Sequence, residues 1–288
     1  MRNALVVFNY NAGRKQAVIY KKNIHRFLFR RCSKFKFVSI DEFEDTDLEE
    51  YDTIFAVGGD GTVNKVAKYV AGTNKTLAII PSGTANLLSA KLGIPTNLKK
   101  ALKIIDQNNI VRIDTLNIND TPCFLRCGLG YDSDIICKTP QSLKNKFGYF
   151  AYFIAGIIFA LRLKSKTYEM RTENKHIRTK ATGIIIANAS NMYRNFFSVG
   201  QDSQLNDGYF DIFILRTKNP ITFFFEFLML TFGLKKNNSR AYYLKAKKLY
   251  IENTWTACHI DGEKSKIKDD IYVSINNNVL RTFCARQT

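Results

Sequence analysis

Short apolar runs that end in glycine-containing loops alternate with helix-like stretches over the first 120 residues. The run ALVVF leads into NYNAG, TIFAV leads into GGDGT, and LAIIP leads into SGTAN. Between these runs, apolar residues recur at helical spacing, as in residues 15–31 and in VNKVAKYVAG. Strands that alternate with helices predict a parallel α/β sheet, whose loops gather at the carboxyl ends of the strands.

The pattern changes after about residue 120. TGIIIANAS, YFDIFIL, KKLYIEN and DIYVSIN are typical of strands, and few helical stretches separate them. We therefore expect an α/β chain in which a parallel-sheet domain over residues 1–120 is followed by a mainly antiparallel β-sandwich over residues 121–275. The last segment, 276–288, is expected to return to the first domain.

One segment could be taken for a membrane span. Residues 150–161 form an unbroken run of 12 apolar or small residues, flanked on both sides by basic ones. A spanning helix needs roughly 20 such residues, so we predict a buried or interfacial helix over 147–163. Because the N-terminal stretch also lacks the pattern of a signal peptide, we expect a cytoplasmic protein that associates peripherally with membranes.

The net charge of the chain indicates which kinds of partner it can bind. The formal net charge is +18, with 43 Lys and Arg against 25 Asp and Glu, which favours nucleic acid, nucleotide phosphates or an acidic membrane. The basic residues are dispersed and no nucleic-acid module is recognisable, so nucleic acid is not the expected partner. Six cysteines without a CxxC pair and three distant histidines offer no zinc ligand set, and free thiols are the plain interpretation.

The stretch GGDGT at 58–62 is the most informative one. A strand that turns through glycines into a helix exposes backbone N–H groups that can hold a phosphate. Asp60 would repel a bare phosphate, so it is interpreted as a helix cap or as a residue that faces Mg²⁺. A tight turn with an Asp cap is an equal alternative. The stretch matches neither the P-loop nor the GxGxxG pattern.

GGDGTVN, followed by PSGTANLLSAKLGIP at 81–95, resembles the diacylglycerol kinase catalytic family. The resemblance is strongest to the bacterial soluble lipid kinases, which are related to sphingosine kinases and, more distantly, to NAD kinases. Further stretches are similar to family motifs in the family's order, namely NYNAG (9–13), RIDTLNIN (112–119), GLGYDSDI (128–135), SQLNDGYFDI (203–212) and HIDGEK (259–264).

The resemblance implies an NAD kinase-like first domain that binds ATP with Mg²⁺. The ATP-binding residues that it implies are Asn9, Asn11, Gly13, Ser39, Gly58, Gly59, Asp60, Gly61, Thr62, Asn64, Thr84 and Asn86. Taken alone, SGTAN would be a turn that caps the following helix.

The resemblance also implies a reaction centre in the stretch DGE. Asp261 would accept the proton of the acceptor hydroxyl, Glu263 would orient the metal, and Asp114 is a further carboxylate of this network. Asp-Gly is equally a leading hairpin turn.

A second metal position is implied by LNDGYFD. In the family this loop holds a structural Mg²⁺, here through Asp207 and the carbonyls of Gln204 and Tyr209. A hairpin turn and a metal site are compatible, because a metal can stabilise a turn.

Two residues depart from the family pattern. Tyr10 stands where the family has Pro, and Leu87 stands where bacterial members often have Asp. We expect an ATP-dependent lipid kinase with diacylglycerol as its acceptor. Phosphatidylglycerol, a sphingoid base, a soluble acceptor as in NAD kinase, and a non-enzymatic anionic-surface protein remain alternatives, and a homodimer is left open.

A basic segment suggests how the protein reaches its lipid. Residues 14–36 contain nine Lys and Arg and no acid, and we expect this face to meet anionic headgroups.

Overall fold

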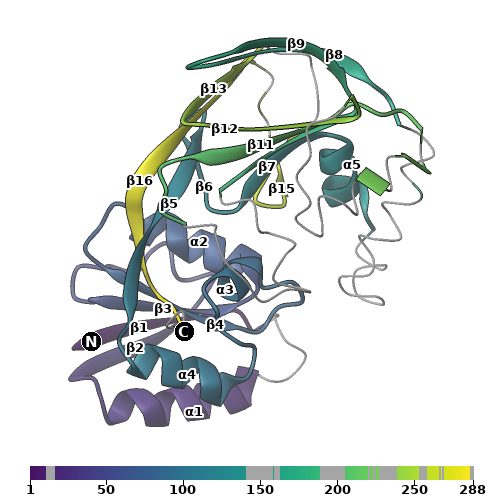
Figure 1. Ribbon diagram of the computed structural model, residues 1–288. Helices are drawn as coiled ribbons and strands as arrows, with labels where there is room; N and C mark the ends of the chain where they lie inside the picture. Colours follow the sequence, from purple (N-terminus) through teal and green to yellow (C-terminus); the bar gives the residue numbers. More distant parts are fainter. Residues whose placement is uncertain are drawn as a thin grey trace. The chain divides into compact units, whose positions relative to one another are not determined.

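The computed structural model of the chain contains two compact units, each described here by itself (Figure 1). The first unit comprises Met1–Ile113 and Asn278–Thr288, and the second comprises Asp114–Asn277. The structure describes residues 1–10, 17–140, 158, 163–188, 205–219, 221–222, 225–226, 239–252, 258–265, 267 and 269–285. The predicted site residues Asn11, Gly13 and Gln204, and the apolar segment 147–163 apart from residues 158 and 163, lie outside the described residues.

The first unit is built on a parallel sheet. Its strands run in the order β2-β1-β3-β4 and are β1 (Asn3–Phe8), β2 (Lys34–Ser39), β3 (Thr53–Gly58) and β4 (Thr76–Pro81). The end of β16 (Ile271–Phe283) joins β4 in parallel, with Thr282 opposite Leu77. Every residue of β3 and β4 is buried, as expected for a sheet that is covered on both faces. The predicted parallel sheet is therefore confirmed.

Helices cover both faces of this sheet. They are α1 (Ala17–Phe29), α2 (Asp60–Val70), α3 (Leu87–Lys91) and α4 (Leu98–Asp106). Figure 1 shows α2 and α3 on one face and α1 with α4 on the other. The buried side of α2 includes Val63, Val66, Ala67 and Val70, so its apolar stripe packs on the sheet as the helical spacing predicts. Within the described ranges, no helix is long and apolar enough to span a membrane.

The second unit is a β-sandwich with one described helix of eight residues, α5 (Tyr131–Lys138). One sheet is antiparallel in the order β12-β11-β10-β7-β14-β15, with strands β7 (Arg126–Gly130), β10 (Gly183–Ala187), β11 (Phe210–Leu215), β12 (Ala241–Ala246), β14 (Cys258–Ile260) and β15 (Glu263–Lys264). The other contains β6 (Thr121–Cys123), β8 (Lys166–Thr172), β9 (His176–Ala181), β13 (Lys248–Ile251), most of β5 (Ile110–Ile118) and the first half of β16.

One apolar core joins these two sheets. Leu116, Tyr168 and Leu249 come from one sheet, Ile184 and Phe210 come from the other, and all are almost fully buried. Each such side chain contributes about 1.5–3 kcal/mol of hydrophobic stabilisation. The antiparallel, β-rich second half is confirmed.

Candidate phosphate-binding and catalytic sites

The turn from β3 into α2 presents backbone N–H groups at the carboxyl edge of the sheet. β3 ends at Gly58, Gly59 is the N-cap residue in an extended conformation, and α2 begins at Asp60. A glycine cap has no side chain with which to cover the N–H groups of the first turn. Gly61 is exposed, and a Cβ built on it would meet no described atom within 4 Å. The helix N-terminus is thus open to an anion, which the helix dipole attracts.

The GGDGT and SGTAN loops touch backbone to backbone. A Cβ on Gly83 would lie 2.4 Å from the Cα of Gly59, and a Cβ on Gly59 would lie 3.2 Å from the Cα of Gly83. The N–H of Ser82 also donates to the carbonyl of Gly58 at 2.9 Å. Side chains at Gly59 and Gly83 would force the loops apart, so glycine is needed at both positions for this approach.

Asn86 shapes the SGTAN loop from inside. Its φ of 50° is left-handed, a conformation that Asn tolerates better than most residues. Its Oδ1 accepts the N–H of Gly83 at 2.9 Å, and its Nδ2 donates to the carbonyl of Gly83 at 2.7 Å. Asn86 is buried, whereas Thr84 at the loop tip is exposed. Thr84, rather than Asn86, is therefore placed to offer its side chain to a ligand.

Asp60 caps a helix, but not its own. Its Oδ1 accepts the N–H of Leu87, the first residue of α3, at 2.6 Å. This contact ties the GGDGT loop to the SGTAN loop a second time. Because the donor is the backbone of Leu87, the departure of its side chain from the family's Asp does not affect it.

Three other residues predicted from the sequence also lie in the first unit. Asn9 follows β1, and its Nδ2 donates to the Oγ1 of Thr62 at 3.0 Å. Ser39 pairs with Phe8 at the ends of β2 and β1, and its Oγ accepts the N–H of Asp41. Asn64 is 4% exposed, and its Oδ1 finds no hydrogen-bond partner among the described residues. Asn9 thus orients Thr62, while the Asn64 oxygen would be satisfied by a ligand or water donor.

Asp261 lies in a tight turn of the second unit, between β14 and β15. Asp261 and Gly262 have φ values of 50° and 91°, as in a type I′ hairpin turn, and Glu263 is exposed. Three backbone N–H groups hold the Asp261 carboxylate: those of Leu125 (2.8 Å) and Arg126 (3.0 Å) reach Oδ1, and that of Phe124 (2.7 Å) reaches Oδ2.

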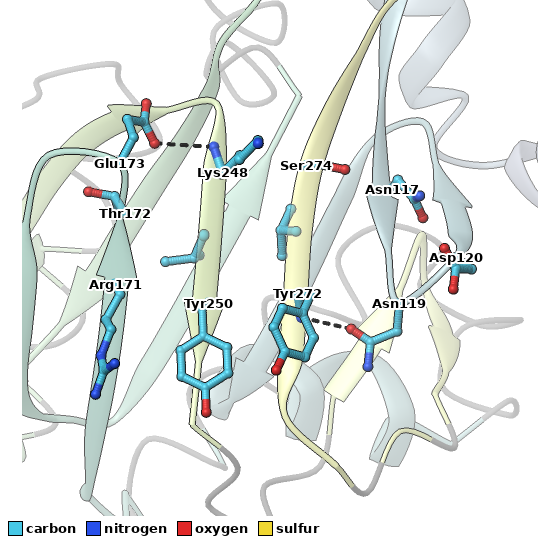
Figure 2. Close-up of a pocket in the computed structure, with 12 residues that line it drawn as sticks. Asn117, Asn119, Asp120, Arg171, Thr172, Glu173, Lys248, Tyr250, Tyr272 and Ser274 are labelled. Atoms are coloured by element: carbon cyan, nitrogen blue, oxygen red, sulfur yellow. Dashed lines mark hydrogen bonds between the residues drawn. The ribbon is translucent and has the colours of Figure 1, made fainter.

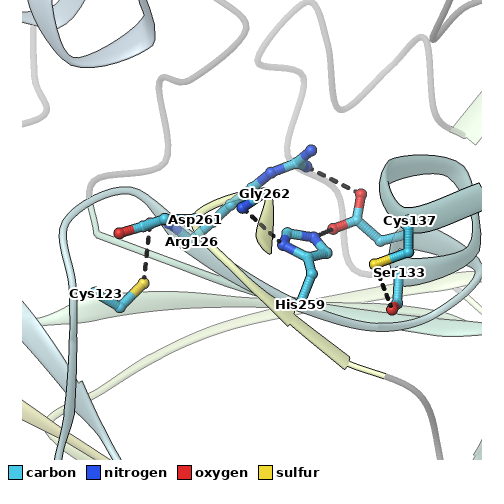
Figure 3. Close-up of polar contacts among 8 residues, drawn as sticks. Cys123, Arg126, Ser133, Cys137, His259, Asp261 and Gly262 are labelled. Carbon is cyan, nitrogen blue, oxygen red and sulfur yellow. Dashed lines mark hydrogen bonds and ion pairs between the residues drawn. The ribbon is translucent and has the colours of Figure 1, made fainter. Parts of the chain in front are cut away.

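The thiol of Cys123 also donates to Oδ1 of Asp261, at 3.2 Å (Figure 3). The carboxylate therefore accepts four hydrogen bonds, three at Oδ1 and one at Oδ2. Each carboxylate oxygen offers about two acceptor positions, so Oδ1 is fully used and Oδ2 is not. Any proton that Asp261 accepts would therefore go to Oδ2.

Asp114 and Asp207 meet at the LNDG loop. Asp114 is 1% exposed; its Oδ2 accepts the N–H of Gly208 at 2.8 Å, and its own N–H donates to the carbonyl of Leu205 at 2.7 Å. Asp207 accepts the N–H of Tyr209 and forms an ion pair of 2.6 Å with Lys245. Mg²⁺ requires oxygen ligands, but an ammonium lies beside this carboxylate, so the described part of the loop does not fit a metal ion.

Among the described residues, no group of three or more His, Cys, Asp or Glu side chains could hold a metal.

A pocket of about 670 Å³ lies elsewhere in the second unit, across strands β5, β8, β13 and β16 (Figure 2). Tyr250 and Tyr272 stand side by side on its wall, with ring centroids 5.0 Å apart, and the N–H of Tyr272 donates to the Oδ1 of Asn119 at 2.7 Å. None of the site residues predicted from the sequence lines this pocket. It is therefore separate from the turn that carries Asp261.

Sequence reasoning missed a buried charged network in the second unit. His259, Asp132 and Arg126 are 0%, 5% and 9% exposed. The Nε2 of His259 lies 2.7 Å from one Asp132 oxygen, and an Arg126 nitrogen lies 3.0 Å from the other. Burial raises the pKa of Asp132, but Arg126 and His259 lower it by more, so that this pKa lies below its usual value. His259 lies in HIDGEK and Asp132 in GLGYDSDI, but nothing in the sequence pairs these two residues, which are 127 positions apart.

Comparison with known proteins connects these loops to one family. Residues 3–118 match the model of the diacylglycerol kinase catalytic domain. The chain is 27% identical over 299 residues to a diacylglycerol kinase of Bacillus subtilis (strain 168), a match that covers 97% of this chain and 95% of that protein. Two other relatives are 34% and 38% identical, but their matches cover only 62% and 52% of this chain. The chain spans 41% and 50% of their own lengths.

Solved structures share the fold. A diacylglycerol kinase from Bacillus anthracis str. Sterne superposes with a TM-score of 0.74 at 18% identity, covering 99% of this chain and 97% of that one. Yeast NADH kinase gives 0.54 at 11% identity, covering 99% and 84%. The predicted NAD kinase-like first domain followed by an antiparallel β domain is thus confirmed. Residues 3–118 thus match the diacylglycerol kinase catalytic-domain model, and nearly the whole chain is similar in sequence to a diacylglycerol kinase.

Proposed function

We propose that the protein is an ATP-dependent lipid kinase that transfers the γ-phosphate of ATP to a lipid hydroxyl, with diacylglycerol as the acceptor and phosphatidic acid as the product. The observation that carries this proposal is the backbone contact between Gly59 and Gly83 beside the open N-terminus of α2, within the segment that matches the diacylglycerol kinase catalytic-domain model. Phosphoryl transfer depends mainly on positioning and on stabilising charge, and this arrangement supplies both to a polyphosphate.

The residues of the first unit fit a nucleotide polyphosphate. The space over Gly61 is free of described atoms, and the positive end of α2 faces it. We assign phosphate binding to the N–H groups of the first turn of α2 and to the exposed hydroxyl of Thr84. Mg²⁺ bound with ATP would neutralise part of the phosphate charge.

Asp261 is the proposed general base. The proton of the acceptor hydroxyl would move to Oδ2, the hydroxyl oxygen would attack the γ-phosphorus, and ADP would leave. The backbone N–H groups of 124–126 fix the orientation of the carboxylate, as a base that acts on one oxygen requires. Glu263 is exposed two positions further on, and we assign it to orienting the metal that accompanies ATP.

Helix α1 is proposed to bring the protein to an anionic membrane. Ile19, Lys22, Arg26 and Phe29 are all exposed and share one face of α1, because they are three or four positions apart. Ile19 is 62% and Phe29 73% exposed, so apolar and cationic groups are presented together, as on helices that lie at membrane interfaces. Arg31 is not part of this face, because it pairs with Asp106.

A salt-dependent binding assay tests this membrane face. Sedimentation with vesicles should rise with the anionic lipid fraction and fall with added salt, since each cation near such a surface contributes about 1 kcal/mol. Lys22→Gln/Arg26→Gln should weaken binding and leave turnover on detergent-dispersed lipid unchanged. Arg178→Gln/Lys180→Gln, on exposed positions of β9, is the matched control. Equal binding by both double variants would remove α1 from membrane docking.

An acceptor panel tests the proposed reaction against its alternatives. γ-Labelled ATP and Mg²⁺ are incubated with the protein and with purified diacylglycerol, phosphatidylglycerol or sphingosine in mixed micelles, or with NAD⁺ in solution. We expect labelled phosphatidic acid from diacylglycerol. Transfer to another lipid would change only the acceptor, whereas transfer to NAD⁺ alone would replace the proposal with the reaction type suggested by the fold of NADH kinase. No transfer, with vesicle binding intact, would favour a non-enzymatic surface protein.

A further inference from the structure

A neutralised charge network lies buried directly behind the turn that carries Asp261. His259 is on β14, Arg126 on β7 and Asp132 in the first turn of α5. Asp132 pairs with both Arg126 and His259, and the N–H of Gly262 donates to the histidine ring, as Figure 3 shows. Burying charged groups is costly unless each one is paired, so such a network points to a role beyond filling space.

The contacts of the ring assign a role to each of its two nitrogens. The N–H of Gly262 donates to the Nδ1 of His259 at 3.3 Å, so Nδ1 carries no proton. Nε2 therefore bears the hydrogen and donates it to Asp132 at 2.7 Å. His259 thus links the turn on one side to the buried ion pair on the other.

The strand beside the ring has a glycine at the position where a side chain would collide with His259 and Asp132. Gly128 lies opposite His259 in the pairing of β7 with β14. A Cβ on Gly128 would lie 1.9 Å from an oxygen of Asp132 and 2.5 Å from the Nε2 of His259. The His259–Asp132 contact therefore depends on a glycine in the neighbouring strand.

Arg126 reaches the same turn by a second route. Its side chain holds Asp132, its N–H donates to the Oδ1 of Asp261, and its carbonyl accepts the N–H of Asp261. Asp261 has a left-handed φ of 50°, a conformation that a non-glycine residue keeps only when its surroundings enforce it. The network thus holds the turn at two consecutive residues, Asp261 and Gly262.

We propose that His259 is a positioning residue for the reaction: through its Nδ1 it fixes the Gly262 amide, and so it sets the orientation of the Asp261 carboxylate toward the acceptor hydroxyl. This inference rests on the proposed function, because it takes Asp261 as the general base. His259 touches no reacting atom in this scheme and acts only through the turn.

Two substitutions separate this role from simple packing. In His259→Gln, the amide nitrogen can still donate to Asp132, but the acceptor for Gly262 is lost. In His259→Asn, the side-chain oxygen can accept the Gly262 N–H, but the shorter side chain loses Asp132. His176→Gln, at an exposed position of the same unit, is the matched control.

The two variants should affect kcat and melting temperature in opposite ways. His259→Gln should melt close to wild type, while kcat falls about 10- to 100-fold at unchanged KM for ATP, because a small displacement of a catalytic group is costly. His259→Asn should melt at a lower temperature yet keep kcat within a few-fold of wild type when assayed well below its melting point. If kcat instead follows melting temperature in both variants, His259 is structural only and the proposal is overturned.

Hydrogen exchange of the segment 258–264 gives a readout that does not need activity. The Gly262 amide should be protected in wild type and in His259→Asn, and should exchange faster in His259→Gln. Unchanged exchange in His259→Gln would overturn the positioning role even in an active kinase. Faster exchange in that variant, with no transfer by wild type to any acceptor, would instead support the positioning of the turn while refuting the proposed function.

Discussion

Substitution of Gly61 separates ligand binding from folding. Gly61 is the second residue of α2 and is exposed, and a Cβ at this position would have no described atom within 4 Å. A Cβ here therefore clashes with no described residue. It enters the space over the helix N-terminus, where a phosphate would have to approach the backbone.

Substitution of Gly61 by alanine should leave thermal stability equal or slightly higher, while ATP affinity should fall. Replacing glycine by alanine in a helix favours folding by up to about 1 kcal/mol, so Gly61→Ala should melt at or slightly above the wild-type temperature. Loss of two charge-assisted hydrogen bonds to phosphate would cost about 1.5–3 kcal/mol each. This corresponds to a loss of about 10²- to 10⁴-fold in ATP affinity, larger for Gly61→Val than for Gly61→Ala.

Calorimetric titration with ATP and Mg²⁺, together with thermal melting, measures both effects. Lys68→Val, at an exposed position near the end of α2, controls for valine on the same helix away from its N-terminus. A Gly61→Val protein that binds ATP as tightly as wild type would refute the assignment of phosphate to this helix. Gly83→Ala is not an equivalent test, since its Cβ would lie 2.4 Å from the backbone of Gly59 and would disturb the fold.

The remaining predictions concern stability. Because Lys245 already neutralises Asp207, we expect the nucleotide-free protein to have the same melting temperature in Mg²⁺ and in chelator at matched ionic strength. A melting temperature that rises only with Mg²⁺ would show that the LNDG loop binds the metal after all. Asp60→Ala should lower the free energy of unfolding in urea by about 0.5–2 kcal/mol, since it removes the cap from Leu87, and an unchanged value would show that the cap is dispensable. The folded-state pKa of Asp132 lies below its unfolded value, so its contribution to stability should be complete above about pH 5 and be lost as the pH falls through about 3.9 toward the folded pKa. An equal free energy of unfolding in urea at pH 6 and at pH 3 would contradict this expectation.

The sequence predicts those features that local chemistry determines. An apolar run followed by glycines predicts both the strand β3 and the open start of α2, because strand, turn and helix are adjacent in the chain. The same holds for the turn at Asp261, where Asp-Gly predicts the left-handed residues that the structure contains. The family motifs add the order of these loops and the fold that contains them.

Tertiary partners could not be predicted in this way. Asp60 accepts the N–H of Leu87, which is 27 positions away, and nothing in the GGDGT stretch indicates this contact. Asp207 finds Lys245 at a separation of 38 positions, and His259 finds Asp132 at 127. A carboxylate is equally suited to an N–H group, an ammonium or a metal ion, so only the packing of the strands decides between them.

Transfer of label from ATP into lipid is the most direct test of the proposed lipid kinase activity. Wild type and Gly61→Val are incubated with γ-labelled ATP, Mg²⁺ and a total lipid extract, and the organic phase is analysed for labelled products. We expect one labelled lipid with wild type, which migrates with phosphatidic acid, and none with Gly61→Val. A folded wild-type protein that binds ATP but leaves the organic phase unlabelled would refute the proposed reaction.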